Sequence, residues 1–411
     1  YSAFVFGFKS KWTFLQRTLP HLEKSFQPLE NLLNNIFLPN LTGRTLTHME
    51  REILSLPARD GGIGIPNPTE TAAANHEDSL KMTKELTERI RQQTWQSPEE
   101  ELIKEVKKQV IREKRKRESE HLKNLKEQIK AETTHHAQKS KSQGLKILES
   151  VTAKGSSCWL TTLPLQDEDR VLNKEEFRDA LALRYGWRPK NFPQKCACGA
   201  DNSITHCLDC KLGGYVTMRH NEMRNTFAKL LTKAGCKVNI EQQLLPVEGE
   251  LDGIKGVEKG DEARMDVTAL GFWGTWQRAF FDVRVFDPFA QSYTQKSIDS
   301  IFKAHEKEKK KKNSKRILEI EKATFTPLVF SVTGGCGKEC DIVLKKLSIM
   351  IAEKTKNTQS KIMNWIRTEI GFTLLRSCIT SIRGWRRSKK EKSSDDIDFD
   401  ITYSRTKPPK I

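Results

Sequence analysis

The stretch CACGADNSITHCLDC, residues 196–210, places four cysteines and one histidine close together in the chain. Thiolates and an imidazole in a closed set of four are typical ligands of structural Zn²⁺, which leave the ion no open position for chemistry. We therefore expect Cys196, Cys198, His206 and Cys210 to hold zinc. Cys207 is an alternative ligand in place of His206 or Cys210, and a set of thiols without metal is the alternative interpretation.

Two aspartates, Asp266 and Asp282, lie inside apolar segments at 263–270 and 278–286 that read as strands joined by a hairpin through GFWGTWQ. Aspartate is depleted in strand interiors, and two neighbouring carboxylates repel each other. A divalent cation relieves both penalties, so the pattern predicts Mg²⁺ bound by this pair. The alternative is that each aspartate pairs with Arg264 or Arg284 at a sheet edge.

Alternation along these strands predicts which side chains share a face of the sheet. It assigns Met265, Val267 and Ala269 to one face, and Arg264, Asp266 and Thr268 to the other. In the second strand it separates two sets, Phe281, Val283 and Val285 from Asp282, Arg284 and Phe286. Asp266 and Asp282 are thus expected to project from the same face.

We call the four expected zinc ligands, Cys196, Cys198, His206 and Cys210, the knot. The segment that follows the knot predicts an amphipathic helix, with Thr217 as its cap and Gly235 at its end. The apolar residues recur at helical spacing: Met223, Phe227, Leu230 and Leu231. Its first two turns carry a dense polar group, which comprises Arg219, His220, Asn221, Glu222 and Arg224. Helix starts attract anions, so these residues are candidates for binding a phosphate backbone; a solvated helix end is the alternative.

The elements that must position these residues follow in a defined order. A strand at 238–245 precedes the two aspartate strands, and a lysine-rich helix, the strand TFTPLVFSVTGG and the helix ECDIVLKKLSIMIAEK come after them. From residue 217 onward the predicted order is α, β, β, β, α, β, α. The fold class expected for the whole chain is α+β with several domains.

The 411-residue chain has 71 Lys+Arg against 53 Asp+Glu, a net charge of +18. Such an excess indicates a polyanionic partner, with nucleic acid first, although it can also serve solubility alone. The nine cysteines are odd in number, which favours a reducing compartment over a disulfide framework. We find neither a run long enough for a membrane helix nor a signal-peptide pattern, so a soluble intracellular protein is expected.

Composition divides the chain into five expected segments. These are a helical module at 1–77, a charged helical linker at 78–148, a helical region with the knot at 149–215, a catalytic domain at 216–387 and a disordered tail at 388–411. We interpret the linker as a solvated spacer, with a coiled coil and a nucleic-acid-tracking helix as alternatives. Because Tyr1 is not a methionine, the chain is expected to be part of a longer reading frame.

The element order, the two strand aspartates and the following lysines resemble the PD-(D/E)xK restriction-like nuclease fold. The upstream knot and the RHN sequence at 219–221 narrow the resemblance to the C-terminal region of non-long-terminal-repeat retrotransposon proteins that carry such an endonuclease. FLQRTLPHLEKSFQPLENLLNNIFLPNLTG and EREILSLPARDGGIGIPNP resemble the segment after the reverse transcriptase palm of these elements. CWLTTLPL, LNKEEFRDALALRYGW and FFDVRVFDP are similar to stretches of animal elements.

The resemblance implies roles for individual residues. Asp266 stands in the place of the aspartate of the proline-aspartate motif, although Met265 replaces the proline, and Asp282 is the second metal-binding acid. Arg284 stands where a nearby lysine would be, so the catalytic lysine is expected from HEKEKK at 305–310, as Lys309 or Lys310. Glu222 is a possible further ligand, and Glu241 a weaker one.

The implied function is Mg²⁺-dependent nicking of DNA, whose freed 3′ end primes copying of element RNA in the nucleus. DNA and element RNA are the implied partners, and the polymerase palm is expected to lie outside this chain because no Y-x-D-D motif occurs. The alternatives are a non-catalytic, zinc-stabilised nucleic-acid-binding module and a decayed or domesticated copy of the element.

Overall fold

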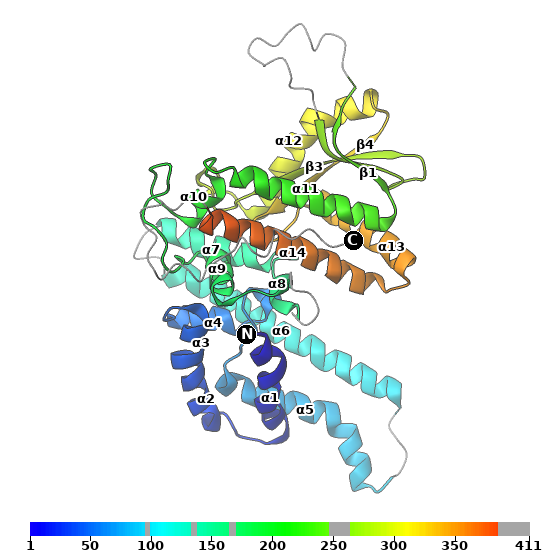
Figure 1. Ribbon diagram of the computed structural model, residues 1–411. Helices are drawn as coiled ribbons and strands as arrows, with labels where there is room; N and C mark the ends of the chain where they lie inside the picture. Colours follow the sequence, from blue (N-terminus) through cyan, green and yellow to red (C-terminus); the bar gives the residue numbers. More distant parts are fainter. Residues whose placement is uncertain (95–98, 133–137, 164–169, 246–263, 385–411) are drawn as a thin grey trace. The chain divides into compact units, whose positions relative to one another are not determined.

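The computed structural model describes residues 1–94, 99–132, 138–163, 170–245 and 264–384 (Figure 1). The expected tail at 388–411 therefore lies outside the described residues. The chain divides into two compact units, one of residues 1–145 with 163–165, the other of residues 146–162 with 166–411. Within the described ranges, no helix combines the length and the apolar character that crossing a membrane requires.

The first unit is helical. Its helices are α1 (Lys9–Thr18), α2 (Gln27–Leu32), α3 (Leu38–Thr42), α4 (His48–Ser55), α5 (Pro68–Arg91) and α6 (Glu100–Glu132), with short π and 3₁₀ turns between the first ones. A small apolar cluster of Trp12, Phe26 and Ala72 holds α1 against α5. Arg51 of α4 donates two hydrogen bonds of 2.8 Å to the buried carboxylate of Glu30. This unit thus depends on a buried ion pair as well as on apolar contacts.

The charged segment after residue 77 is not a solvated spacer, which corrects the interpretation from sequence. Helix α5 crosses the expected boundary, and α6 packs against it. Arg117 of α6 contacts Asp78 of α5 at 2.6 Å, and Val110 and Leu125 of α6 are buried. The apolar residues of α6 are few, but ion pairs between α5 and α6 add to their contacts and hold α6 against α5.

The second unit begins within α7 (Gln138–Thr152) and continues through α8 (Cys158–Thr161), α9 (Lys174–Tyr185) and α10 (Ile204–Asp209). Helix α9 starts at a reciprocal cap: the N–H of Glu176 donates to Asn173 Oδ1 at 2.8 Å, and the N–H of Asn173 donates to Glu176 Oε2 at 3.0 Å. The local sequence NKEE at 173–176 encodes this capping box.

A four-stranded mixed sheet with flanking helices follows, and the class α+β is confirmed. The strands are β1 (Lys237–Gln243), β2 (Arg264–Leu270), β3 (Arg278–Phe286) and β4 (Thr324–Ser331), in the order β1-β2-β3-β4. The first two pairings are antiparallel, and β3 pairs with β4 in parallel. With α11 (Tyr215–Ala234), α12 (Ile298–Glu319) and α13 (Lys338–Thr355), the order is the predicted α, β, β, β, α, β, α.

The predicted cap of α11, Thr217, lies three residues after the observed one, Gly214. The helix begins at Tyr215, after Gly214 with a φ of +71°, a conformation that suits glycine and replaces a side-chain cap. Its end at Gly235, with a φ of +98°, is as predicted.

Helices cover both faces of the sheet (Figure 1). On one face Phe227 of α11, Val267 of β2 and Phe281 of β3 join one large apolar core with α13 and α14 (Gln359–Arg383). On the other face α12 packs through two smaller clusters, which contain Phe280 and Phe286 of β3. The predicted alternation of β3 is thus confirmed.

The predicted alternation of β2 is wrong at Met265. This side chain packs with Phe280 in the cluster on the α12 face, whereas Val267 belongs to the core on the opposite face. The regular β1–β2 register lacks a pair at Asp266, and Glu241, the residue that would face it, has a φ of +52°. A local irregularity of the β1–β2 pair at Asp266 therefore reverses the side-chain direction between Met265 and Val267.

Candidate functional site

The knot is built from a tight turn and a short helix. The Cys196 N–H donates to the Ala200 carbonyl at 2.9 Å, and the Gly199 N–H donates to the Cys196 carbonyl at 2.8 Å. Gly199 has a φ of +87°, which lets the chain reverse directly after Cys198. Ser203 then caps α10 by accepting a 3.0 Å hydrogen bond from the His206 N–H. Local backbone bonds thus turn all four predicted ligands toward one point.

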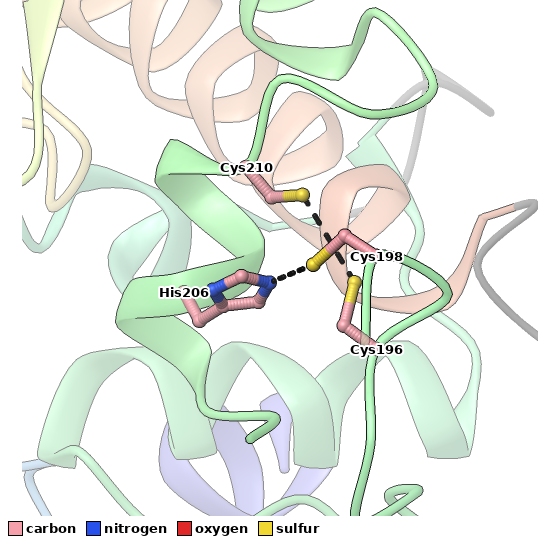
Figure 2. Close-up of side chains that lie close together, drawn as sticks. All are labelled: Cys196, Cys198, His206 and Cys210. Atoms are coloured by element: carbon pink, nitrogen blue, oxygen red, sulfur yellow. Dashed lines mark hydrogen bonds between the residues drawn. The ribbon is translucent and has the colours of Figure 1, made fainter. Parts of the chain in front are cut away.

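Figure 2 shows these four side chains converging, with Cys196 and Cys198 on the turn, His206 on α10 and Cys210 directly after it. The Cys196 and Cys210 sulfurs are 4.0 Å apart, and Cys198 Sγ lies 3.2 Å from His206 Nε2. All four ligand atoms lie within 4.8 Å of one another. A tetrahedral zinc–thiolate site has ligand–ligand separations of about 3.8 Å, so the set can hold a metal such as zinc.

The ionisation of the thiols bears on metal binding because the thiolate is the ligand. A backbone hydrogen bond from Ala200 lowers the pKa of Cys198, the exposed member of the set. Burial raises the pKa of Cys196. Without a cation the buried cysteine therefore favours its neutral form, and a bound metal would offset that penalty.

Cys207, the alternative ligand, faces away from this set. It is buried, and its thiol donates to Asn202 Oδ1 at 3.0 Å. The side chain packs with Phe192 and Ile382. It follows His206 by one residue on α10, about 100° further around the helix, and this rotation directs it into the core.

The two aspartates face each other where β2 and β3 separate. The antiparallel pairing ends at Val267 with Phe281, and the next rung would join Asp266 to Asp282. Here the ladder hydrogen bond is replaced: the Val283 N–H donates to Asp266 Oδ2 at 2.6 Å. The two carboxyl groups lie within hydrogen-bonding reach of each other. The structure thus brings together the pair that sequence reasoning selected.

Asp266 has a histidine partner on α11. His220 Nε2 lies 3.1 Å from Asp266 Oδ1. Burial alone would raise the pKa of Asp266, but the hydrogen bond and charge of His220 and the Val283 N–H together hold it below its usual value. Asp266 therefore stays ionised. His220 lies against this carboxylate in the structure, and its predicted contact with nucleic acid stays a prediction.

Asp282 has two partners on α12, Lys309 and Asn313. Lys309 Nζ donates to Asp282 Oδ1 at 2.8 Å, and Asn313 Nδ2 donates to Asp282 Oδ2 at 3.0 Å. Burial raises the pKa of Asp282, Lys309 opposes that rise, and the negative charge of Asp266 adds to it. Without a cation the two neighbouring carboxyls therefore differ in ionisation, with Asp282 the one that tends to hold a proton.

These contacts distinguish the two predicted lysines by their partners. Lys309 reaches Asp282, whereas Lys310 donates to Glu339 of α13 at 2.7 Å. Asn313 was missed by sequence reasoning. The available signal was its spacing, because Asn313 follows Lys309 by four residues and so shares its helix face.

The additional acids are not brought to the pair. Glu222 is exposed on α11, two residues from His220 and therefore about 200° around the helix from it. Glu241 forms an ion pair with Arg224. Neither is a ligand in this arrangement.

The predicted nucleic-acid-binding residues fall into two groups. Arg219 is 2% exposed and donates to the Leu208 carbonyl at 2.8 Å, and Arg224 is buried against Glu241. These two are therefore structural, which corrects the prediction from sequence. Asn221 is half-buried, while Arg264 and Arg284 are exposed. The aspartates take their partners from α11 and α12, so the alternative of pairing with Arg264 or Arg284 is not favoured.

The knot and the aspartate pair thus offer different ligand atoms to a metal. Among the residues that the structure describes, the cysteine–histidine set is the one group of three or more such ligands compact enough for a metal. The aspartate pair offers carboxylate oxygens, flanked by a histidine and a lysine. Compared with known proteins, the chain matches no family model and no curated protein.

Proposed function

We propose that this chain is a metal-dependent DNA endonuclease of the restriction-like type, and that the sheet with α11 and α12 is its catalytic core. The observation that carries the proposal is the arrangement around Asp282. This residue of β3 lies against Asp266 of β2 and accepts a hydrogen bond from Lys309 of α12. Two acids on adjacent strands and a lysine from the following helix are the elements that the resemblance requires.

The donor set suits Mg²⁺. This ion takes oxygen ligands, and proteins commonly supply one or two carboxylates while water and substrate phosphates complete the shell. Asp266 and Asp282 would hold the ion, because burial and the nearby charge of Asp266 raise the pKa of Asp282 and a cation would relieve both penalties. When bound, such an ion supplies Lewis-acid stabilisation of phosphate charge and a more acidic water.

The surrounding side chains have distinct roles in this proposal. His220 fixes the carboxylate of Asp266 by its 3.1 Å contact, and Asn313 fixes that of Asp282. Lys309 is the cation available to stabilise negative charge on the scissile phosphate and to orient the attacking water. Its side chain is 20% exposed, so a substrate can reach it while Asp282 holds it in place.

The DNA backbone requires exposed cations near this pair. Arg284 lies on β3 two residues beyond Asp282 and is exposed, as is Lys312, three residues beyond Lys309 on α12. These two residues replace Arg219 and Arg224 as the proposed phosphate contacts. Further exposed lysines continue along the outer side of α12, namely Lys307, Lys311 and Lys315.

We further propose that the activity serves a retrotransposon. In that setting the nuclease nicks chromosomal DNA in the nucleus, and the freed 3′ end primes copying of element RNA. The knot, which we propose holds structural Zn²⁺, precedes the catalytic core as the resemblance implies. The support for this context is the resemblance alone.

A plasmid-nicking assay with Mg²⁺ or Mn²⁺ tests the proposal, with wild type compared to the double variant Asp266→Asn/Asp282→Asn. The amides keep the size and shape of both side chains but remove the negative charges that a metal needs, and each replaces one accepting oxygen by a donating NH2 group. We expect nicking to fall by at least about 10³-fold. DNA affinity, measured by fluorescence anisotropy, should stay within about threefold. Nicking that persists in this variant would reject the assignment.

A second candidate is a zinc-stabilised nucleic-acid-binding module without catalysis. It is favoured by one observation: four hydrogen-bonding partners already satisfy the aspartates without metal, namely His220, the Val283 N–H, Lys309 and Asn313. If the wild-type protein binds DNA but does not nick it in the presence of any divalent metal, the binding module replaces the endonuclease as the proposed function.

A further inference from the structure

The buried guanidinium of Arg219 connects the knot to helix α11, which packs on the sheet. It lies in the first part of α11, and its Nη2 donates to the carbonyl of Leu208 in α10. Leu208 stands between the knot residues His206 and Cys210, two positions from each. The short helix that carries His206 and ends just before Cys210 is therefore tied directly to α11.

The same guanidinium acts on two further elements. Asp287, at the end of β3, is 2% exposed, and Arg219 stabilises its charged form against burial. The thiol of Cys378 on α14 lies against Arg219 and is also buried. Arg219 is thus hydrogen-bonded to α10, and its positive charge lies near Asp287 after β3 and Cys378 of α14.

The residue after Arg219 is His220, which contacts Asp266 at 3.1 Å. Successive helical residues point about 100° apart, so one turn of α11 presents Arg219 to the knot and His220 to the aspartate. A helix turn is stiff, and a displacement of Arg219 moves His220 with it. No other side chain is needed to connect the two sites.

We propose that Arg219 is a positioning residue through which metal binding at the knot orders the start of α11 and so sets the position of His220 against Asp266. The coupling is reciprocal: if metal binding favours the ordered start of α11, then the knot binds metal more tightly when the start of α11 is ordered. Its consequence for nicking rests on the proposed nuclease function, whereas the coupling itself rests only on the proposed zinc site of the knot.

Two measurements on the full chain test the coupling without any nuclease assay. The first is the rate of zinc release to a chromogenic chelator. The second is hydrogen exchange of the amides at 219–226, with zinc bound and after chelation. In wild type we expect chelation to raise this exchange by at least about tenfold, within the usual range of coupling between sites.

The variant Arg219→Met keeps the length of the side chain and removes its charge and donors. We expect its zinc release to be about tenfold faster than in wild type and its exchange at 219–226 to be raised already, so that chelation adds less than about twofold. Arg219→Lys, which restores the charge and one donor, should recover part of both effects. If Arg219→Met does not fold, the lysine variant alone carries the test.

Arg224→Met is the matched control, because Arg224 is a buried arginine of the same helix that pairs with Glu241 and not with α10. It should lower stability but leave zinc release unchanged. The proposal would be overturned if both Arg219 variants release zinc at the wild-type rate. It would also be overturned if amide exchange at 219–226 in the wild-type protein is the same with zinc bound and after chelation. Absence of nicking with both readouts intact would instead count against the proposed function only.

Discussion

The knot and the aspartate pair are assembled in opposite ways. All four knot ligands come from fifteen consecutive residues, held by a glycine turn and the capped start of α10. The aspartate pair draws its contacts from four elements, with His220 46 residues before Asp266 and Lys309 27 residues after Asp282. The knot therefore depends on local backbone geometry, whereas the pair depends on the packing of α11 and α12 onto the sheet.

The charges of the two sites are also balanced differently. The thiols of the knot contact one another and His206, and a metal would stabilise them as thiolates. Each aspartate of the pair already contacts one cationic or ionisable side chain, His220 or Lys309. We therefore expect loss of metal from the knot to disrupt its structure, whereas the aspartate pair should keep its contacts when no metal is bound between the two carboxylates.

Replacing a knot ligand should give the largest effect. Cys210→Ser removes one thiolate, and we expect zinc content to fall to near zero and the free energy of unfolding to fall by about 5 kcal/mol or more, since structural zinc binding is itself folding free energy. Metal analysis and chemical denaturation measure the two effects. Cys207→Ser is the control and should retain zinc. Zinc retained in Cys210→Ser would show that the ligand set is wrong.

The two lysines of α12 sharpen the contrast at the aspartate pair. Lys309→Met should lower nicking by about 10²-fold, because it removes the cation that contacts Asp282. Lys310→Met should change nicking by less than about threefold, because Lys310 pairs with Glu339. Equal losses in both variants would mean that neither contact defines the catalytic lysine. Zinc content should be unchanged in both, since the knot does not include α12.

Asp287, which lies near Arg219, gives the protein a pH dependence. Burial raises its pKa from 3.8 to about 7, so the folded chain holds this proton where the unfolded chain has released it. Stability should therefore fall as pH rises through this window, by about 2 kcal/mol between about pH 5.5 and 7.5. Denaturation of zinc-loaded protein across this range measures it, and Asp287→Asn should abolish the slope. A slope unchanged in that variant would assign the effect elsewhere.

The smallest expected effect is at His220. His220→Ala should reduce nicking by about tenfold, because Asp266 keeps its hydrogen bond from the Val283 N–H but loses its second anchor. Asn221→Ala, one residue along the same helix, should be near neutral. Should both variants bind DNA more weakly without a change in the rate of nicking, the original expectation that His220 contacts nucleic acid would be supported.

The sequence by itself determined the features that short-range patterns encode. The four knot ligands, the capping box at Asn173 and the order of helices and strands after residue 217 all follow from spacing and alternation within a few residues. The positions of the two aspartates on adjacent strands also followed, because the hairpin between β2 and β3 is short enough to fix their register.

Tertiary structure alone decided the partners of those residues. Periodicity cannot tell which of two successive lysines turns toward Asp282, since that depends on how α12 rotates as its apolar side settles on the sheet. Nor can composition show that Arg219 is buried or that α6 docks on α5. Such outcomes depend on contacts between residues far apart in the chain, whose energies are set only when the elements pack together.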